Sequence, residues 1–127
     1  MDLARQLVFS GSPFESAVGY ARAVRVGPLV YVSGTTAAGK DAGEQAAEVL
    51  RRIGSALAEA GAAPEDVVRT RVYLTDMAHF SDVGRAHAEV FGDVRPATAV
   101  VEVAALAAPE LLVEIEADAV IGGAWPE

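Results

Sequence analysis

The sequence contains no cysteine, and only 6% of its residues are aromatic. Without cysteine the chain has no disulfide, no thiolate nucleophile and no zinc–thiolate site. The absence is typical of a cytoplasmic protein, which is the localisation that we expect. Because aromatic residues are few while 52% of the chain is hydrophobic, the core must be built from small side chains, chiefly Ala and Val, that pack closely.

Basic residues are also few. Ten Lys and Arg stand against 18 Asp and Glu, and the formal net charge is −8. Nucleic-acid binding depends on clustered Lys and Arg that neutralise phosphates, so we expect no nucleic-acid partner. No apolar stretch approaches the roughly 20 residues that span a bilayer, and residues 1–5 do not read as the start of a signal peptide. We therefore expect no membrane partner.

With 127 residues the chain has the size of one domain, and residues 1–127 contain no repeat and no linker. Apolar periodicity and turn signals predict the order β-β-β-α-β-α-β-β. The first strand is expected to end at residues 7–9, and residues 34–43 to form a loop. The other strands are expected at residues 20–26, 29–33, 67–76, 97–104 and 111–121, and the helices at residues 42–60 and 80–91.

Both predicted helices lie in crossover connections, which are overwhelmingly right-handed, so we expect them on one face of the sheet. Several strands are nevertheless apolar on both faces, and the segment Leu29–Val32 has no polar face at all. A sheet that is buried on both faces needs a second cover, and a chain of this length has no further element to supply it. The sequence therefore predicts an α+β fold within a homo-oligomer.

Two motifs have weak functional interpretations. Residues 34–40 have the spacing of a phosphate-binding loop, but Asp41 follows where a hydroxyl should hold magnesium, so we interpret the segment as an ordinary loop. His79 and His87 have no third partner at ligand spacing. A buried or interface position is the better interpretation for His87, and a ligand or catalytic role is the alternative. We expect neither a metal nor a cofactor.

Two predicted strands carry polar side chains at alternate positions, which puts each set on one face of its strand. The acidic set has two interpretations: a solvated rim, or a cleft in which one carboxylate holds a polarised water, with a pKa raised by desolvation and mutual repulsion. The basic set either pairs with the acidic strand or binds an anion. The acidic set is Glu114, Glu116 and Asp118, and the basic set is Arg69 and Arg71 with Tyr73.

Five segments carry a resemblance to a known family when they are taken together in this order: Tyr20–Gly27, Val32–Gly34, Val67–Asp76, Arg95–Val103 and Val113–Ala117. Over roughly residues 20–120 the chain resembles the Rid family, also called the YjgF or L-PSP family. The resemblance implies a chorismate-mutase-like fold, assembled as a homotrimer with small-molecule clefts at the subunit interfaces. It also implies hydrolysis of enamines or imines, such as 2-aminoacrylate, to 2-keto acids and ammonia without a metal or cofactor.

Position by position, the resemblance implies that Tyr20, Ser33 and Gly34 contact the ligand and that Glu114 positions the attacking water. The family's carboxylate-binding arginine falls at Thr98. A bidentate arginine–carboxylate contact is worth about 1.5–3 kcal/mol per hydrogen bond, and a threonine hydroxyl cannot replace its charge. The chain therefore resembles the arginine-lacking Rid subgroups rather than the archetypal deaminases.

Two functions stay open. The first is a hydrolase or deaminase that acts on a small imine, enamine or related electrophile. In that case Arg22, Arg25 or Arg71 replaces the missing arginine, with Arg71 as our expected ligand-binding residue, or the ligand lacks a carboxylate and meets Thr98 through a neutral hydrogen bond. The second is a non-catalytic small-molecule binder or regulator. Some family members have been named endoribonucleases, and the acidic charge argues against that activity for this chain.

Overall fold

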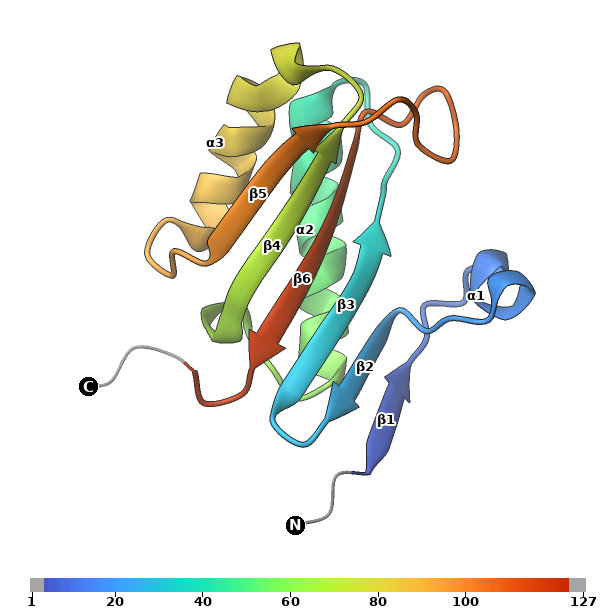
Figure 1. The fold of residues 1–127 in the computed structure, drawn as a ribbon, viewed down its shortest axis with the longest axis vertical. Helices are drawn as coiled ribbons and strands as arrows, with labels where there is room; N and C mark the ends of the chain where they lie inside the picture. The colour runs from blue at the N-terminus through green and yellow to red at the C-terminus, as the bar shows by residue number, and fades with distance from the viewer. Residues whose placement is uncertain (1–3, 124–127) are drawn as a thin grey trace.

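The computed structural model describes residues 4–123. Within them, six strands form one sheet in the order β1-β2-β3-β6-β4-β5, with antiparallel neighbours except for the parallel pair β4–β5. The predicted α+β fold is confirmed, and Figure 1 shows the arrangement. The elements are β1 (Arg5–Val8), α1 (Pro13–Val18), β2 (Ala23–Val26), β3 (Leu29–Thr35), α2 (Ala42–Glu59), the 3-10 turn η1 (Pro64–Asp66), β4 (Val67–Leu74), the 3-10 turn η2 (Met77–His79), α3 (Phe80–Phe91), β5 (Ala97–Glu102) and β6 (Val113–Val120).

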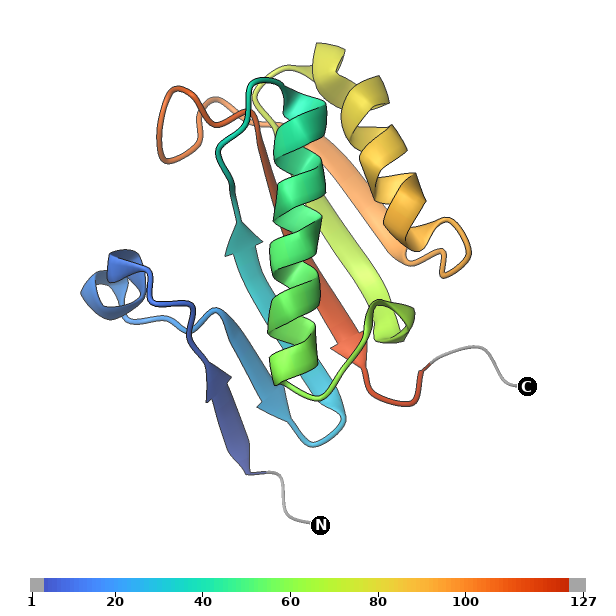
Figure 2. The ribbon, with the colours of Figure 1, turned by 180° about the vertical axis from the view of Figure 1, so that it is seen from behind.

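Helices α2 and α3 lie side by side on one face of the sheet, as predicted, and Figure 2 shows them in front of it. The long helix α2 begins where the side chain of Asp41 accepts a hydrogen bond from the Glu44 N–H at 2.8 Å. It ends just before Gly61, whose φ of 87° places it in the left-handed region that a residue with a Cβ atom avoids. Its apolar stripe, including Val49, Ile53 and Leu57, is fully buried against the strands.

The core between helices and sheet is built mainly from Ala, Val, Ile and Leu side chains, as the composition predicts. On the sheet side it uses alternate residues of β3, β4 and β6, because side chains in a strand point to opposite faces in turn. These residues are Val30, Val32, Val72, Leu74, Val113, Ile115, Ala117 and Ala119. The intervening residues, Glu114 and Glu116 among them, therefore lie on the opposite face.

That opposite face is uncovered by any element of the described chain, and apolar side chains stand on it. Tyr31 is 48% exposed, Val101 is 45% exposed and Leu29 is 38% exposed. Large exposed apolar groups on a sheet face favour a partner surface. The finding agrees with the sequence argument for a second cover, and the identity of that cover as other subunits stays a prediction.

The first part of the chain differs most from its expected structure. Residues 13–18 form helix α1, which was not predicted, although Ser12 caps it, Pro13 opens it and Gly19 closes it with a φ of 88°. Strand β2 begins at Ala23 rather than at residue 20. Strand β3 continues to Thr35, through an irregularity in its pairing with β6. These shifts matter because they shape the groove described below.

In helix α3, Phe80, Val83, His87 and Val90 were the residues expected to mark the apolar face, and the structure buries a different stripe. Val83 and Phe91 are buried, whereas Phe80 is 52% exposed and Val90 is 38% exposed. The ring of His87 lies 4.8 Å from the ring of Phe91, between centroids. The helix therefore packs through positions 83, 87 and 91, which are four residues apart and share one face.

Candidate functional site

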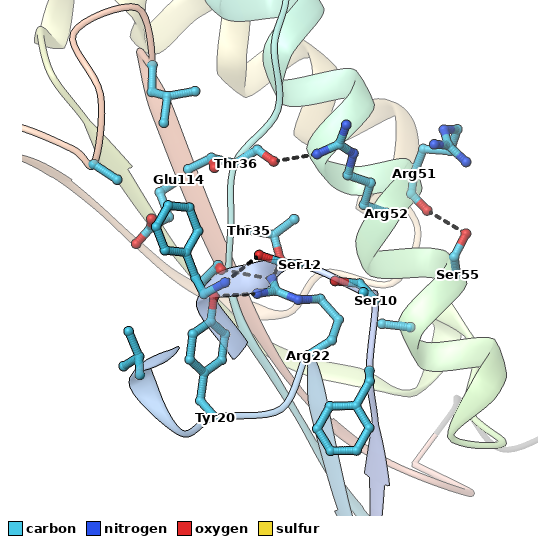
Figure 3. A pocket seen from close by; sticks show the side chains of 18 of the residues that line it. Ser10, Ser12, Tyr20, Arg22, Thr35, Thr36, Arg51, Arg52, Ser55 and Glu114 are labelled. Carbon is cyan, nitrogen blue, oxygen red and sulfur yellow. Dashed lines mark hydrogen bonds between the residues drawn. The ribbon is translucent and has the colours of Figure 1, made fainter. Parts of the chain in front are cut away.

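A groove of about 890 Å³ opens at the end of β3 where β2 no longer covers its edge. Its walls come from the loop before α1 and α1 itself, from α2, and from the loop that precedes β6. Figure 3 shows the groove with Tyr20, Arg22 and Glu114 around the last residues of β3. The lining residues are Phe9, Ser10, Gly11, Ser12, Phe14, Val18, Tyr20, Arg22, Gly34, Thr35, Thr36, Arg51, Arg52, Ser55, Ala56, Glu59, Ala107, Ala108, Leu111 and Glu114.

Glu114 reaches the groove from β6 and packs against Gly34 of β3. A Cβ atom at position 34 would lie 2.8 Å from Oε2 of Glu114, so only glycine leaves room for the carboxylate there. Burial raises the pKa of Glu114 above its ordinary value, repulsion from Glu116 adds to the rise, and the charge of Arg22 opposes it. Within residues 4–123 no donor lies within hydrogen-bond distance of this carboxylate, so its lone pairs are free to accept from water or a ligand.

Of the three candidate arginines Arg22, Arg25 and Arg71, Arg22 lines the groove within one protomer. Its Nη1 donates to the carbonyl oxygen of Gly34 at 2.9 Å and to Oγ1 of Thr35 at 2.7 Å. Its Nε lies 3.6 Å from a carboxylate oxygen of Glu15. The guanidinium therefore bonds to Gly34 and Thr35, the part of β3 that lies beyond its pairing with β2.

Glu15 is a buried acid that the sequence analysis did not single out. It is only 4% exposed. Its carboxylate accepts hydrogen bonds from the backbone N–H and the hydroxyl of Ser10. Burial acts to raise its pKa, but these hydrogen bonds and the charge of Arg22 together lower it. The pair Glu15–Arg22 thus fastens α1 to the edge of β3, and the spacing of Ser12, Pro13 and Gly19 was the available signal for that helix.

Two of the residues implied to bind ligand, Tyr20 and Gly34, line the groove beside Glu114. The guanidinium carbon of Arg22 lies 5.6 Å from the centre of the Tyr20 ring, and its Nη2 lies 3.5 Å from the Tyr20 hydroxyl. Ser33 does not line the groove: its hydroxyl donates to the carbonyl oxygen of Ala21 at 2.7 Å. Within the protomer Ser33 fixes the bend between Ala21 and β2.

Arg71 lies on the open face of the sheet, away from the groove. Its Nη1 is 3.3 Å from Glu116 and 3.2 Å from Asp118, and the Tyr73 hydroxyl donates to Glu116 at 2.9 Å. Arg71 and Tyr73 of the basic set therefore pair with the acidic strand, which is the first of the two interpretations given above. Arg25 is also remote, since it donates to the carbonyl oxygens of Gly27 and Ala60 at the other end of β2.

Thr98 points toward the helix side of the sheet, whereas Glu114 lies on the open face. The Thr98 hydroxyl is 2.8 Å from Oγ1 of Thr70, which is itself 2.8 Å from Nε2 of His87. Burial lowers the pKa of His87 and so favours its neutral form. Within one protomer Thr98 and Glu114 therefore do not converge, and any site that uses both needs a second subunit.

Residues 4–123 contain no group of three or more His, Asp and Glu side chains that could hold a metal ion. None of their helices is long and apolar enough to cross a membrane.

Comparison with known proteins decides the family. Residues 10–121 match the family model described as Endoribonuclease L-PSP. This chain belongs to the Rid family. The crystal structure of Rv2704, a member of the YjgF/YER057c/UK114 family from Mycobacterium tuberculosis, has 59% identity and a TM-score of 0.92 over 93% of this chain and 100% of that chain.

Two curated relatives cover most of this Rid chain as well. An uncharacterized protein of Streptomyces coelicolor is 40% identical over 122 residues, which are 91% of each chain. A protein of Mus musculus named 2-iminobutanoate/2-iminopropanoate deaminase is 36% identical over 124 residues, again 91% of each chain. The Rid membership expected from the five sequence segments is thereby confirmed.

Proposed function

We propose that this Rid protein hydrolyses a small imine, enamine or related electrophile and that Glu114 positions the water. The observation that carries the proposal is the state of Glu114: it faces the groove, its pKa is raised by burial, and no described donor occupies its oxygens. A general base is most effective when its pKa approaches the working pH. The mouse relative's name, an iminoacid deaminase, supports the same class of reaction.

In the proposed reaction, the substrate reacts as an iminium with a protonated nitrogen, which an enamine reaches by taking a proton from water at its carbon. Water adds to the iminium carbon while one of its protons passes to the Glu114 carboxylate, which gives a neutral carbinolamine. Glu114 returns this proton to the nitrogen, and the C–N bond breaks as the hydroxyl gives its own proton to Glu114, so that ammonia leaves behind a ketone or aldehyde. Tyr20 and the backbone at Gly34 lie beside Glu114 and would hold the substrate at this end of the groove.

We further propose a homotrimer in which a neighbouring subunit completes each groove. The support is the uncovered sheet face and the placement of Thr98 on the side of the sheet opposite Glu114. Position 98 carries no guanidinium, so it cannot form an ion pair with a substrate carboxylate next to the reacting carbon. The ligand either lacks that carboxylate or binds it elsewhere.

The test is release of 2-keto acid and ammonia from freshly generated 2-aminoacrylate and from bulkier iminoacids. We expect turnover above the spontaneous rate, and we expect Glu114→Ala to abolish it. The matched control is Glu89→Ala, which removes an exposed glutamate of α3. Turnover that survives in Glu114→Ala would remove the proposed role of this residue. Absence of acceleration with every imine and enamine tried would remove the hydrolase itself.

Replacing Thr98 with arginine is the complementary test. If the rest of the site is competent, Thr98→Arg should gain hydrolysis of iminoacids that carry a carboxylate next to the C=N carbon. A charge-assisted contact supplies about 1.5–3 kcal/mol, or roughly ten- to a hundredfold in kcat/KM. A variant that folds and shows no gain on such substrates would mean that position 98 does not face the reacting end of the groove.

A non-catalytic binding role is the second candidate. It is favoured by the hydrogen bonds that already engage the Thr98 hydroxyl, to Thr70 and to the Pro96 carbonyl oxygen, and by the commitment of Arg22 to Glu15 and β3. Under this alternative, Glu114→Ala retains ligand affinity and neither protein shows turnover. Calorimetry of the two proteins with the same stable keto acid separates the candidates.

A further inference from the structure

The groove continues well beyond Glu114 to the surface of α2. Arg52, Ser55 and Glu59 line that end, at positions i, i+3 and i+7 of one helix face. Cavities of about 300–1,000 Å³ hold drug-sized ligands, so a groove of about 890 Å³ far exceeds the needs of a three- or four-carbon iminoacid. The far end therefore has room for a second part of a longer molecule.

Arg52 is the arginine of the groove that forms no ion pair with the described residues, although its charge helps to lower the pKa of Glu48. The other two lining arginines form ion pairs, Arg22 with Glu15 and Arg51 with Glu48. Among residues 4–123, no carboxylate lies within ion-pair distance of Arg52.

A single hydrogen bond orients the Arg52 side chain. Its Nη1 donates to the carbonyl oxygen of Thr36 at 3.0 Å, and Figure 3 shows the side chain extending from α2 toward Thr36. A guanidinium has five N–H donors, so four remain for a ligand, including those of Nε and Nη2 that can form a bidentate fork with a carboxylate.

The two nearest carboxylates on α2 do not occupy this fork. Glu48 is held by Arg51, whose Nε lies 2.6 and 2.9 Å from its two oxygens. Glu59 is seven residues after Arg52, which is about 10 Å along the helix axis. The lining carries three arginines and two glutamates in a chain of net charge −8, so the groove is locally more positive than the protein around it.

We propose that the α2 end of the groove, at Arg52, is an anion subsite. It binds the carboxylate of an elongated oxo or imino acid whose reacting carbon lies at Glu114, so that several bonds separate the two groups. The inference rests on the proposed function for the identity of the reacting group, but the anion subsite itself is a matter of binding. In this arrangement a different wall of the groove recognises the substrate carboxylate, because position 98 cannot.

Two isomeric keto acids test this arrangement without any need for turnover. In 2-oxohexanoate the carboxylate adjoins the ketone, whereas in 5-oxohexanoate three methylene groups separate them, and 5-oxohexanamide removes the charge. Affinities are measured by calorimetry at low salt for wild type, Arg52→Met and Arg85→Met. Arg85 lies on α3, outside the groove, in an exposed pair with Asp82, so it controls for the loss of one positive charge.

We expect 5-oxohexanoate to bind more tightly than either other compound, and Arg52→Met to weaken it by about tenfold or more, the loss of one charge-assisted contact. Arg85→Met should bind like wild type. The inference is overturned if Arg52→Met leaves the affinity unchanged, if Arg85→Met weakens it equally, or if 2-oxohexanoate is preferred. Selective binding of 5-oxohexanoate without hydrolysis of any imine would remove the proposed function and leave the anion subsite standing.

Discussion

Two glutamates flank Arg22, and the pKa values of their carboxyl groups are shifted in opposite directions. Glu15, on α1, is nearly inaccessible, and burial alone would raise its pKa, yet hydrogen bonds from Ser10 and the charge of Arg22 bring the pKa below its ordinary value. Glu114, on β6, is only half-buried, yet its pKa is raised, because burial and repulsion from Glu116 outweigh the same arginine.

The difference shows that donors, more than depth, decide the state of a carboxyl group. Glu15 accepts from an N–H and an O–H, both of which stabilise its charged form. Glu114 has no such donor in the described chain, so its charge is poorly compensated and its oxygens stay available. The Glu15 side of the groove is thus a fixed support, whereas the Glu114 side offers a carboxylate that can react. Arg22 belongs mainly to the support.

Removing the support should have the largest effect. Glu15→Ala leaves the guanidinium of Arg22, which is 12% exposed, without its carboxylate partner. Loss of one member of a buried pair costs about 3–5 kcal/mol, and we expect the free energy of unfolding in urea to fall by about 3 kcal/mol. The control Glu48→Ala breaks the exposed pair with Arg51 and should change stability little. Equal effects in the two variants would contradict the assignment of Glu15 as a buried anchor.

The sequence predicted the elements whose signals are local and long. Helix α2 combines a capping aspartate, eighteen periodic residues and a glycine stop, and its bounds were nearly correct. Helix α1 has comparable caps at Ser12 and Gly19, but its six residues are too few to establish a helical period. It was therefore missed, and with it the role of Glu15, whose effect depends on the tertiary contact with Arg22.

The candidate site was predicted in its residue types but not in its geometry. The sequence offered Arg22, Arg25 and Arg71 as candidates, and we expected Arg71 to bind the ligand. Arg22 reaches the groove only because β2 begins after it, at Ala23, and leaves the edge of β3 at Gly34 free to accept its hydrogen bond. The opposite orientation of Thr98 and Glu114 depends on how β5 and β6 align with β4 between them, and alternation within single strands does not encode that alignment.

A bulkier residue at position 34 should displace the Glu114 carboxylate and abolish its raised pKa. In Gly34→Ala the new Cβ would lie 2.8 Å from Oε2 of Glu114, so the carboxylate must move away. A displacement of about 1 Å in a catalytic group costs about a hundredfold in rate, and we expect that loss in imine hydrolysis. Carboxyl NMR titration gives a second readout, in which the pKa of Glu114 should shift back toward its ordinary value as the carboxylate gains solvent.

The matched control for this variant is Gly54→Ala in α2, where a Cβ atom meets nothing within 4 Å. Alanine is favoured over glycine in a helix by about 1 kcal/mol, so this variant should be at least as stable as wild type. Its Glu114 should keep the same raised pKa as in wild type. If Gly34→Ala also left the titration and the rate unchanged, the close approach of Gly34 and Glu114 would have no functional weight.

The smallest expected effect concerns stability and pH. Because the pKa of Glu114 is higher in the folded protein than in the unfolded chain, the folded state binds more protons between the two pKa values. Stability therefore falls as pH rises through that interval. Glu114→Gln removes this loss, so its stability relative to wild type should increase from acid toward neutral pH and then level off.

The gain from Glu114→Gln should be about 0.5 kcal/mol or less, because solvent screens a half-exposed carboxylate. Urea unfolding of both proteins across the acid to neutral range measures it, with exposed Glu89→Gln as the control. For Glu15→Gln the dependence reverses, since the folded-state pKa of Glu15 is lowered and its stabilisation is lost as pH falls. Parallel curves for the two variants would mean that the glutamates on either side of Arg22 do not differ in the way their hydrogen bonds indicate.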